Sequence, residues 1–158
     1  MDLVDMGKYR YKNKGYYWIL TAVEILSRYS FAIPVYRKNT ENMTKAVDNL
    51  LEQFKTRSGK YPNVTQFDEG KEFHNVGVKT FLESKDVTYF SSYGPKKAAV
   101  VERFNRTLKT KMWKYFCAEK THTWVNVLND FVLNYNTSKN RSIQMKPVDA
   151  NKTNEHQV

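Results

Sequence analysis

Cysteine and histidine are scarce in this sequence, which has only Cys117 and three histidines in 158 residues. One cysteine excludes a disulfide within the chain and a zinc site built on several cysteines, and the histidines lack the spacing of metal ligands. The apolar stretch WILTAVEIL, residues 18–26, is too short to span a bilayer and is interrupted by Glu24. The N-terminus lacks the basic start and apolar run of a signal peptide. We therefore expect an intracellular protein with no membrane partner.

Acidic residues are few relative to basic ones: 16 Asp and Glu stand against 26 Lys and Arg, a formal net charge of +10. This excess is spread along the chain, so it favours nucleic acid as the partner over a membrane surface. The length suits one domain with a sizeable core. We expect that domain to occupy residues 1–150, with residues 151–158 as a disordered tail.

Apolar periodicity predicts alternating strands and helices after three initial strands. The predicted strands are 2–6, 16–26, 30–36, 63–67 and 87–90, and the predicted helices are 40–54, 75–85, one beginning at 100, and 124–135, with Pro147 starting a short last helix. The order β-β-β-α-β-α-β-α-α indicates an α/β fold, a mixed five-stranded sheet flanked by helices.

The predicted helix VVERFNRTLKTK, residues 100–111, raises a question about its one acid. On a helical wheel, Glu102 shares a face with Arg106, Lys109 and Trp113, away from the apolar stripe. One interpretation is an intrahelical ion pair between Glu102 and Arg106, worth about 0.2–0.5 kcal/mol. The other interpretation depends on carboxylates elsewhere in the chain.

Two further acids lie at positions where α/β sheets commonly carry functional residues. Asp68 follows a predicted strand, and Asp2 lies in the first strand, which we expect to sit centrally. Carboxylate oxygens without His or Cys suit Mg²⁺ or Mn²⁺. Alternatives remain open: Asp68 as a turn former, Asp2 as a frayed terminal residue, and Asp5, which faces the opposite way on a strand, as the ligand in place of Asp2. The nearby Glu69 and Glu72 fit solvated turn positions.

Three stretches, DLVDM, FDEGKEF and YGPKKAAVVERFNRTLK, resemble in order the three signature blocks of the retroviral-type integrase catalytic core. These proteins are DDE recombinases with an RNase H-like fold. VERFNRTLK and the later YNTSKNRSIQMKP are similar to integrases of Ty3-type retrotransposons and Maverick/Polinton DNA elements. The sequence departs from the family pattern at Asn140, where His is frequent, and at Ala98-Ala99, where the loop before the Glu often carries Gly.

The resemblance implies a polynucleotidyl transferase that carries out 3′-end processing and strand transfer, joining the ends of a mobile element to target DNA. Asp2, Asp68 and Glu102 would be the catalytic residues and would hold two Mg²⁺ or Mn²⁺ ions, with no small-molecule cofactor. The expected DNA contacts are Arg106, Lys109, Lys96, Lys97 and Tyr93. If the host is eukaryotic, we expect a nuclear protein.

The resemblance also places a dimer interface on helices like 40–54 and 124–135. A sheet of about five strands is not expected to bury both of these amphipathic helices fully. We therefore predict a homodimer or higher oligomer.

Two other functions remain open at this point. One is another RNase H-like nuclease, such as a ribonuclease H, against which the VERFNRTLK block and the late helix argue. The other is a domesticated integrase-like domain that binds nucleic acid without catalysis. The complete set of three acids argues against the second, although an intact set does not prove activity.

Overall fold

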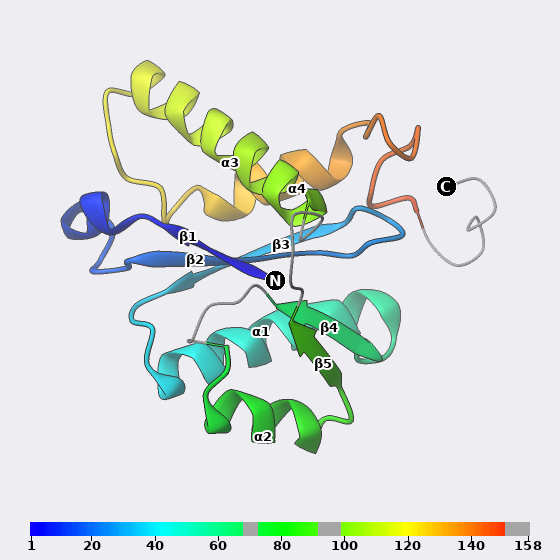
Figure 1. Cartoon of the computed structure of the whole chain (residues 1–158). Coiled ribbons are helices and arrows are strands. Elements are labelled where there is room, and N and C mark those ends of the chain that lie inside the picture. The colour runs from blue at the N-terminus through cyan, green and yellow to red at the C-terminus, as the bar shows by residue number, and fades with distance from the viewer. Residues whose placement is uncertain (68–72, 92–98, 151–158) are drawn as a thin grey trace.

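The computed structural model describes residues 1–67, 73–91 and 99–150 of the chain (Figure 1). The elements are β1 (Asp2–Asp5), the 3₁₀ helix η1 (Gly7–Lys12), β2 (Trp18–Val23), β3 (Ser30–Val35), α1 (Thr40–Ser58), β4 (Val64–Phe67), α2 (Val76–Ser84), β5 (Thr88–Ser91), α3 (Ala99–Ala118) and α4 (Leu128–Thr137). The predicted α/β class and the order of strands and α-helices are confirmed. The added element is η1, between β1 and β2.

The five strands form two ladders rather than the one continuous sheet that we predicted. Strands β1, β2 and β3 pair antiparallel in that order, and β4 pairs with β5 in parallel. The backbone of Gln66 in β4 accepts a hydrogen bond from the ammonium group of Met1, which precedes β1. Thus β1 lies at the side of its ladder that faces β4.

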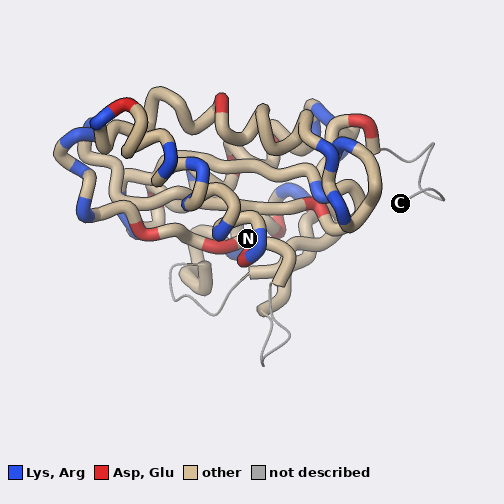
Figure 2. The backbone as a smooth tube through the Cα atoms, turned by 90° about the horizontal axis from the view of Figure 1, so that it is seen from above, with Lys and Arg blue, Asp and Glu red and all other residues tan. Residues whose placement is uncertain are grey.

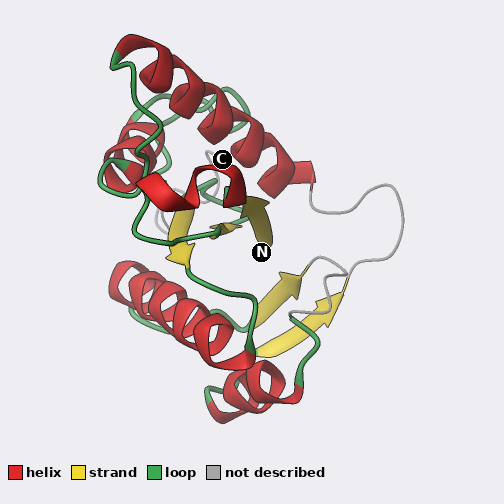
Figure 3. Cartoon of the chain, turned by 90° about the vertical axis from the view of Figure 1, so that its left-hand side faces the viewer, coloured by secondary structure: helices red, strands yellow, loops and turns green. Residues whose placement is uncertain are grey.

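Helices cover both faces of the three-stranded ladder, as Figure 3 shows. The side chains of β2 alternate: Ile19 packs in the cluster with α3 and α4, whereas Leu20 packs in the cluster with α1 and α2. In β1, Val4 pairs with Ile19 and shares the α3 cluster. Since alternate residues of a strand face the same side, Asp2 lies on the α3 face and Asp5 on the other.

Helix α1 is longer than predicted and ends at Gly59, whose φ of 78° is the left-handed conformation that favours glycine at a helix end. Its N-terminus is capped by Asn39, whose side chain accepts a hydrogen bond from the Asn42 N–H. Its apolar side chains are buried against the sheet; they are Met43, Ala46, Val47, Leu50 and Leu51. Helix α1 is thus covered on its apolar side, whereas α4 exposes Leu133, in line with the expectation that the sheet does not bury both helices fully.

Two predicted boundaries are corrected by the structure. Strand β2 ends at Val23 because the chain turns at Glu24, whose carboxylate accepts a hydrogen bond from Ser27. Helix α4 begins at Leu128 rather than residue 124. The backbone N–H groups of Trp124 and Val125 donate to the side-chain oxygen of Asn13, at 2.6 and 3.1 Å, and so hold the segment before α4 against the end of η1.

No helix follows Pro147 within the described part of the chain. The carbonyls of Pro147 and Ala150 accept hydrogen bonds from the guanidinium of Arg57, at 3.0 and 2.7 Å. These contacts fasten the segment to the end of α1. The predicted tail, residues 151–158, lies outside the described residues.

Candidate active site

Asp2 is held between β1 and α3. Its Oδ2 accepts a hydrogen bond from Nδ2 of Asn105 at 2.6 Å, and its Oδ1 accepts one from the backbone N–H of Leu3 at 2.7 Å. The side chain is half-buried. By contrast, Oδ1 of Asp5 accepts a hydrogen bond from the Gly7 N–H at 2.8 Å, which stabilises the turn into η1. Of the two candidates for the first ligand, Asp2 is therefore the one beside the Glu102 helix.

The partner of Asp2, Asn105, was not among the residues proposed from the sequence. It lies on the buried side of α3, among the apolar stripe, and is 7% exposed. Its Oδ1 is buried and has no hydrogen-bond partner among the described residues. The sequence does contain a sign of this role: Asn105 directly follows Phe104 and precedes Leu108 by three residues, which puts its amide on a helix face that is otherwise apolar. A buried polar group with one unsatisfied atom calls for an explanation in function.

Glu102 lies in the first turn of α3, one turn before Asn105, and is exposed. Among the described residues its carboxylate forms no ion pair; the pairs found there involve other acids, namely Glu24, Glu41, Asp48 and Glu52. The alternative of a Glu102–Arg106 ion pair is therefore wrong. Since Asn105 reaches Asp2, the turn of helix that carries Glu102 is fixed against β1.

Asp68 follows the last residue of β4 and lies outside the described residues. The residues on either side of that gap are well packed: the rings of Phe67 and Phe73 stack with their centroids 4.7 Å apart. His74 then shares a 2.8 Å hydrogen bond with Ser91 at the end of β5. The hydrogen bond between Met1 and Gln66 links the start of β1 to β4. Met1 directly precedes Asp2, and Gln66 lies two residues before Asp68.

The remaining sequence-predicted positions near Asp68 and before α3 also fall outside the described residues; they are Glu69, Glu72, Tyr93, Lys96 and Lys97. Within residues 1–67, 73–91 and 99–150, no three His, Cys, Asp or Glu residues gather as a metal site. The donors present suit a hard divalent cation nevertheless. Asp2 and Glu102 offer carboxylate oxygens, and the unsatisfied amide oxygen of Asn105 lies on the side chain that binds Asp2.

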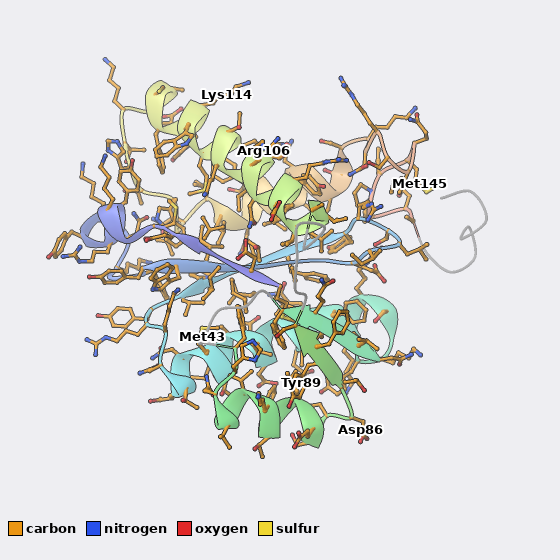
Figure 4. All side chains as sticks on the ribbon, in the orientation of Figure 1. Met43, Asp86, Tyr89, Arg106, Lys114 and Met145 are labelled. Atoms are coloured by element: carbon orange, nitrogen blue, oxygen red, sulfur yellow. The ribbon has the colours of Figure 1, made fainter. Side chains whose placement is uncertain are left out.

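The cations of α3 fall into two groups. Arg106 and Lys109 are exposed, and neither makes a side-chain hydrogen bond or ion pair with any residue in the described ranges. Figure 4 labels Arg106 and Lys114 along α3, above the sheet. Lys111, on another face, donates a hydrogen bond to Asn134 of α4, and burial lowers the pKa of its ammonium group. Arg106 and Lys109 are thus available to bind a ligand on the Glu102 face.

A search for membrane-spanning helices through the described residues finds none of sufficient length and apolarity.

Comparisons of sequence identify the family. Residues 1–92 match the integrase core domain. An uncharacterised transposon-derived protein of Caenorhabditis elegans is 35% identical over 145 residues, covering 92% of this chain and 49% of that protein. The Pol polyprotein of Radiation murine leukemia virus (strain Kaplan) is 29% identical over 116 residues, covering 72% of this chain and 19% of the polyprotein. The chain thus spans half or less of the length of these relatives.

Comparison of structure agrees. A chain of the simian T-cell lymphotropic virus intasome, solved in complex with PP2A regulatory subunit B56 gamma, superposes with a TM-score of 0.76. The match covers 89% of this chain and 51% of the other at 18% identity, which shows a shared fold. The strands and helices described above are those of the RNase H-like integrase core. By its matching domain and by its relatives, this chain belongs to the integrase core domain family.

Proposed function

We propose that this chain is the catalytic core of a DNA integrase or transposase that acts on the ends of a mobile element. Members of the family are typically DDE polynucleotidyl transferases. The observation that carries the proposal is the hydrogen bond from Asn105 to Asp2, which fixes the Glu102 turn of α3 against β1. The transposon-derived relative supports a mobile element as the source. That the element is of Ty3 or Maverick/Polinton type rests on the sequence resemblance alone.

In this proposal Asp2, Asp68 and Glu102 hold the metal. When bound, two Mg²⁺ or Mn²⁺ ions supply activation of the attacking oxygen and stabilisation of the leaving oxygen. The protein's own contribution is to fix its carboxylates. Asn105 orients Asp2, and the first turn of α3 presents Glu102 from a rigid helix.

Phosphoryl transfer here needs no covalent intermediate on the protein. A new P–O bond forms to water in 3′-end processing, or to a DNA 3′-hydroxyl in strand transfer, while the bond to the leaving oxygen breaks. Arg106 and Lys109 bind phosphates beside the scissile one, because they follow Glu102 on the same face by one and two turns. Positioning of the DNA is thereby coupled to the helix that carries the carboxylate.

Other parts of the proposal rest on sequence alone. Lys96 and Lys97 would extend the phosphate contacts, and Tyr93 would stack at a DNA end. Residues 1–150 would form the catalytic domain. A homodimer or higher oligomer remains a prediction, for which the exposed Leu133 of α4 offers apolar surface.

The function is tested on branched DNA that already holds a 3′-hydroxyl beside the scissile phosphate. Such a substrate supplies the proximity that assembly of two DNA ends otherwise creates. We expect residues 1–158 to join the strands when Mn²⁺ or Mg²⁺ is present and not in a chelator, as followed by gel electrophoresis. Cleavage of an RNA–DNA hybrid instead would favour another RNase H-like nuclease. Metal binding by a folded protein without any reaction would favour the non-catalytic alternative.

The role of the α3 cations is tested by the salt dependence of DNA binding. Arg106→Ala and Lys109→Ala are each expected to weaken duplex binding and to reduce the slope of log K against log [salt] by about 0.9, one phosphate contact. Fluorescence anisotropy at several salt concentrations measures it. Lys60→Ala is the control, because Lys60 is exposed beyond α1, on the opposite face of the sheet. A double variant with the wild-type slope would show that this face does not touch DNA.

A further inference from the structure

The row of residues that begins with Glu102 ends in an exposed tryptophan. Trp113 follows Lys109 on the same face of α3 and is 48% exposed, whereas the other tryptophans, Trp18 and Trp124, are half-buried and buried. From Glu102 to Trp113 the helix rises about 16 Å. This ring lies at the edge of the α3 core cluster and leaves about half of its surface open, beyond two cations that have no side-chain partner among the described residues.

Trp113 is held in place by aromatic contacts to η1 and to its own helix. Its ring meets that of Tyr9 edge-on at 5.8 Å and that of Phe116 at 5.5 Å. Tyr9 in turn packs against Phe116 at 5.5 Å and stacks on His122 at 4.9 Å. The 3₁₀ helix is therefore docked on the second half of α3, and Trp113 is a fixed side chain rather than a freely rotating one.

η1 and the turn after it are strongly basic. Between Asp5 and Glu24 the chain has no acid and four cations, namely Lys8, Arg10, Lys12 and Lys14. In Figure 2, Lys and Arg lie at this left-hand end as well as along the rest of the molecule. Asp5, the acid nearest in sequence, is turned to the Gly7 N–H. The excess of positive charge at this end is therefore not offset from within the segment.

Aromatic rings are interleaved with these cations. Tyr11 is 82% exposed, with the guanidinium of Arg10 4.0 Å from its ring centroid, and the ammonium of Lys8 lies 5.7 Å from the ring of Tyr9. Exposed cation–π pairs stabilise a surface by about 0.5–1 kcal/mol each. That contribution helps to hold Arg10 over Tyr11, while Trp113, whose ring meets Tyr9 of the same 3₁₀ helix, stays half-exposed.

We propose that Lys8, Tyr9, Arg10, Tyr11 and Trp113 form an aromatic-basic platform that binds a DNA strand a few nucleotides from the scissile phosphate, at the far end of α3 from Glu102. Lys8 and Arg10 bind its phosphates, and Trp113 stacks on a base. A base offers its face to a side chain only where it is unpaired, so the platform recognises a single-stranded or frayed segment. The placement rests on the proposed function, in which DNA leaves Glu102 along α3.

The stacking role is tested with Trp113→Leu and Trp113→Phe. Leucine keeps apolar contact with Tyr9 and Phe116 but has no ring, whereas phenylalanine keeps a ring. We expect Trp113→Leu to weaken binding of a short single-stranded oligonucleotide about tenfold, and Trp113→Phe to retain most of the wild-type affinity. Neither variant is expected to weaken binding of a blunt duplex to this extent. Anisotropy titrations are made without catalytic metal, well below the melting temperature of each variant. Equal affinities of the two variants for the single strand would overturn the stacking role.

The phosphate role is tested with Lys8→Ala against Lys60→Ala, both exposed lysines, one on the platform and one on the opposite face of the sheet. Only Lys8→Ala is expected to lower the salt slope for the single strand, by about 0.7, one phosphate. The same titrations include the double variant Arg106→Ala/Lys109→Ala. If that variant weakens binding while the Lys8 and Trp113 variants do not, the platform is overturned and the proposed function stands. If the Lys8 and Trp113 variants weaken binding of the single strand but the wild-type protein does not join branched DNA, the platform stands and the catalytic proposal fails.

Discussion

Glu102→Gln is expected to abolish metal-dependent joining of branched DNA while leaving the protein folded. Glutamine has nearly the same size and helix propensity, and Glu102 is exposed, so no packing is lost. What is lost is the charge that a divalent cation requires from its ligand. In the proposed site, removal of one of three carboxylates also relieves repulsion between like charges, so the metal-free variant should be at least as stable as the wild type.

Thermal unfolding with and without Mn²⁺ separates loss of metal from loss of fold. A cation at a hundred times its dissociation constant raises the free energy of unfolding by about 2.7 kcal/mol. The wild type should show this gain, and Glu102→Gln and Asp68→Asn should show much less of it. An unchanged metal-induced stabilisation in Glu102→Gln would remove that residue from the metal site.

Asp2→Asn and Asp5→Asn form a matched pair on one strand. Asp2 lies on the α3 face and contacts Asn105, whereas Asp5 lies on the other face and contacts the Gly7 N–H. We expect Asp2→Asn to abolish joining and Asp5→Asn to leave it near the wild-type rate, with at most a small loss of stability. The opposite result would make Asp5 the ligand and would contradict the assignment of Asp2.

The sequence predicted the helices and strands more successfully than the contacts between them. Helices α1 and α3 were predicted because their apolar residues recur every three or four positions, a property of the local chain. The alternation of side chains along a strand likewise predicts that Asp2 and Asp5 face opposite sides of the sheet. It does not predict which of these two sides α3 covers. That choice depends on the pairing of Val4 with Ile19 and on the packing of α3 over them, contacts between distant segments.

Other features depend on similar long-range contacts. Asn13 holds the backbone of Trp124, just before α4, across more than a hundred residues of sequence, and no local pattern predicts such a bond. η1 has only six residues and no apolar periodicity, so its docking through Tyr9 onto α3 was not predicted. Asn105 was likewise passed over, because a polar residue within a helix is ordinarily assigned to the solvent side.

Asn105→Leu is expected to reduce metal-dependent joining about 10- to 100-fold with little change in stability. Leucine matches the apolar surroundings of this buried position and removes the unsatisfied Oδ1. It also removes the hydrogen bond to Oδ2 of Asp2, which water can replace because Asp2 is only half-buried. The folded protein therefore tolerates the change, while Asp2 loses the side chain that orients it.

Asn136→Ala provides the contrasting case of a buried asparagine with a structural role. Asn136 bonds the N–H and the carbonyl of Ser30, each at 2.9 Å, and its loss leaves both backbone groups unsatisfied, at about 1–3 kcal/mol each. Asn136→Ala should therefore lower the melting temperature and keep the Mn²⁺-induced gain. Asn105→Leu should keep the melting temperature and lose about 1.4 kcal/mol of that gain for each tenfold loss of metal affinity. If Asn105→Leu instead lowered stability and left the metal effect intact, Asn105 would be a structural residue like Asn136, and the contact with Asp2 would no longer support the proposed site.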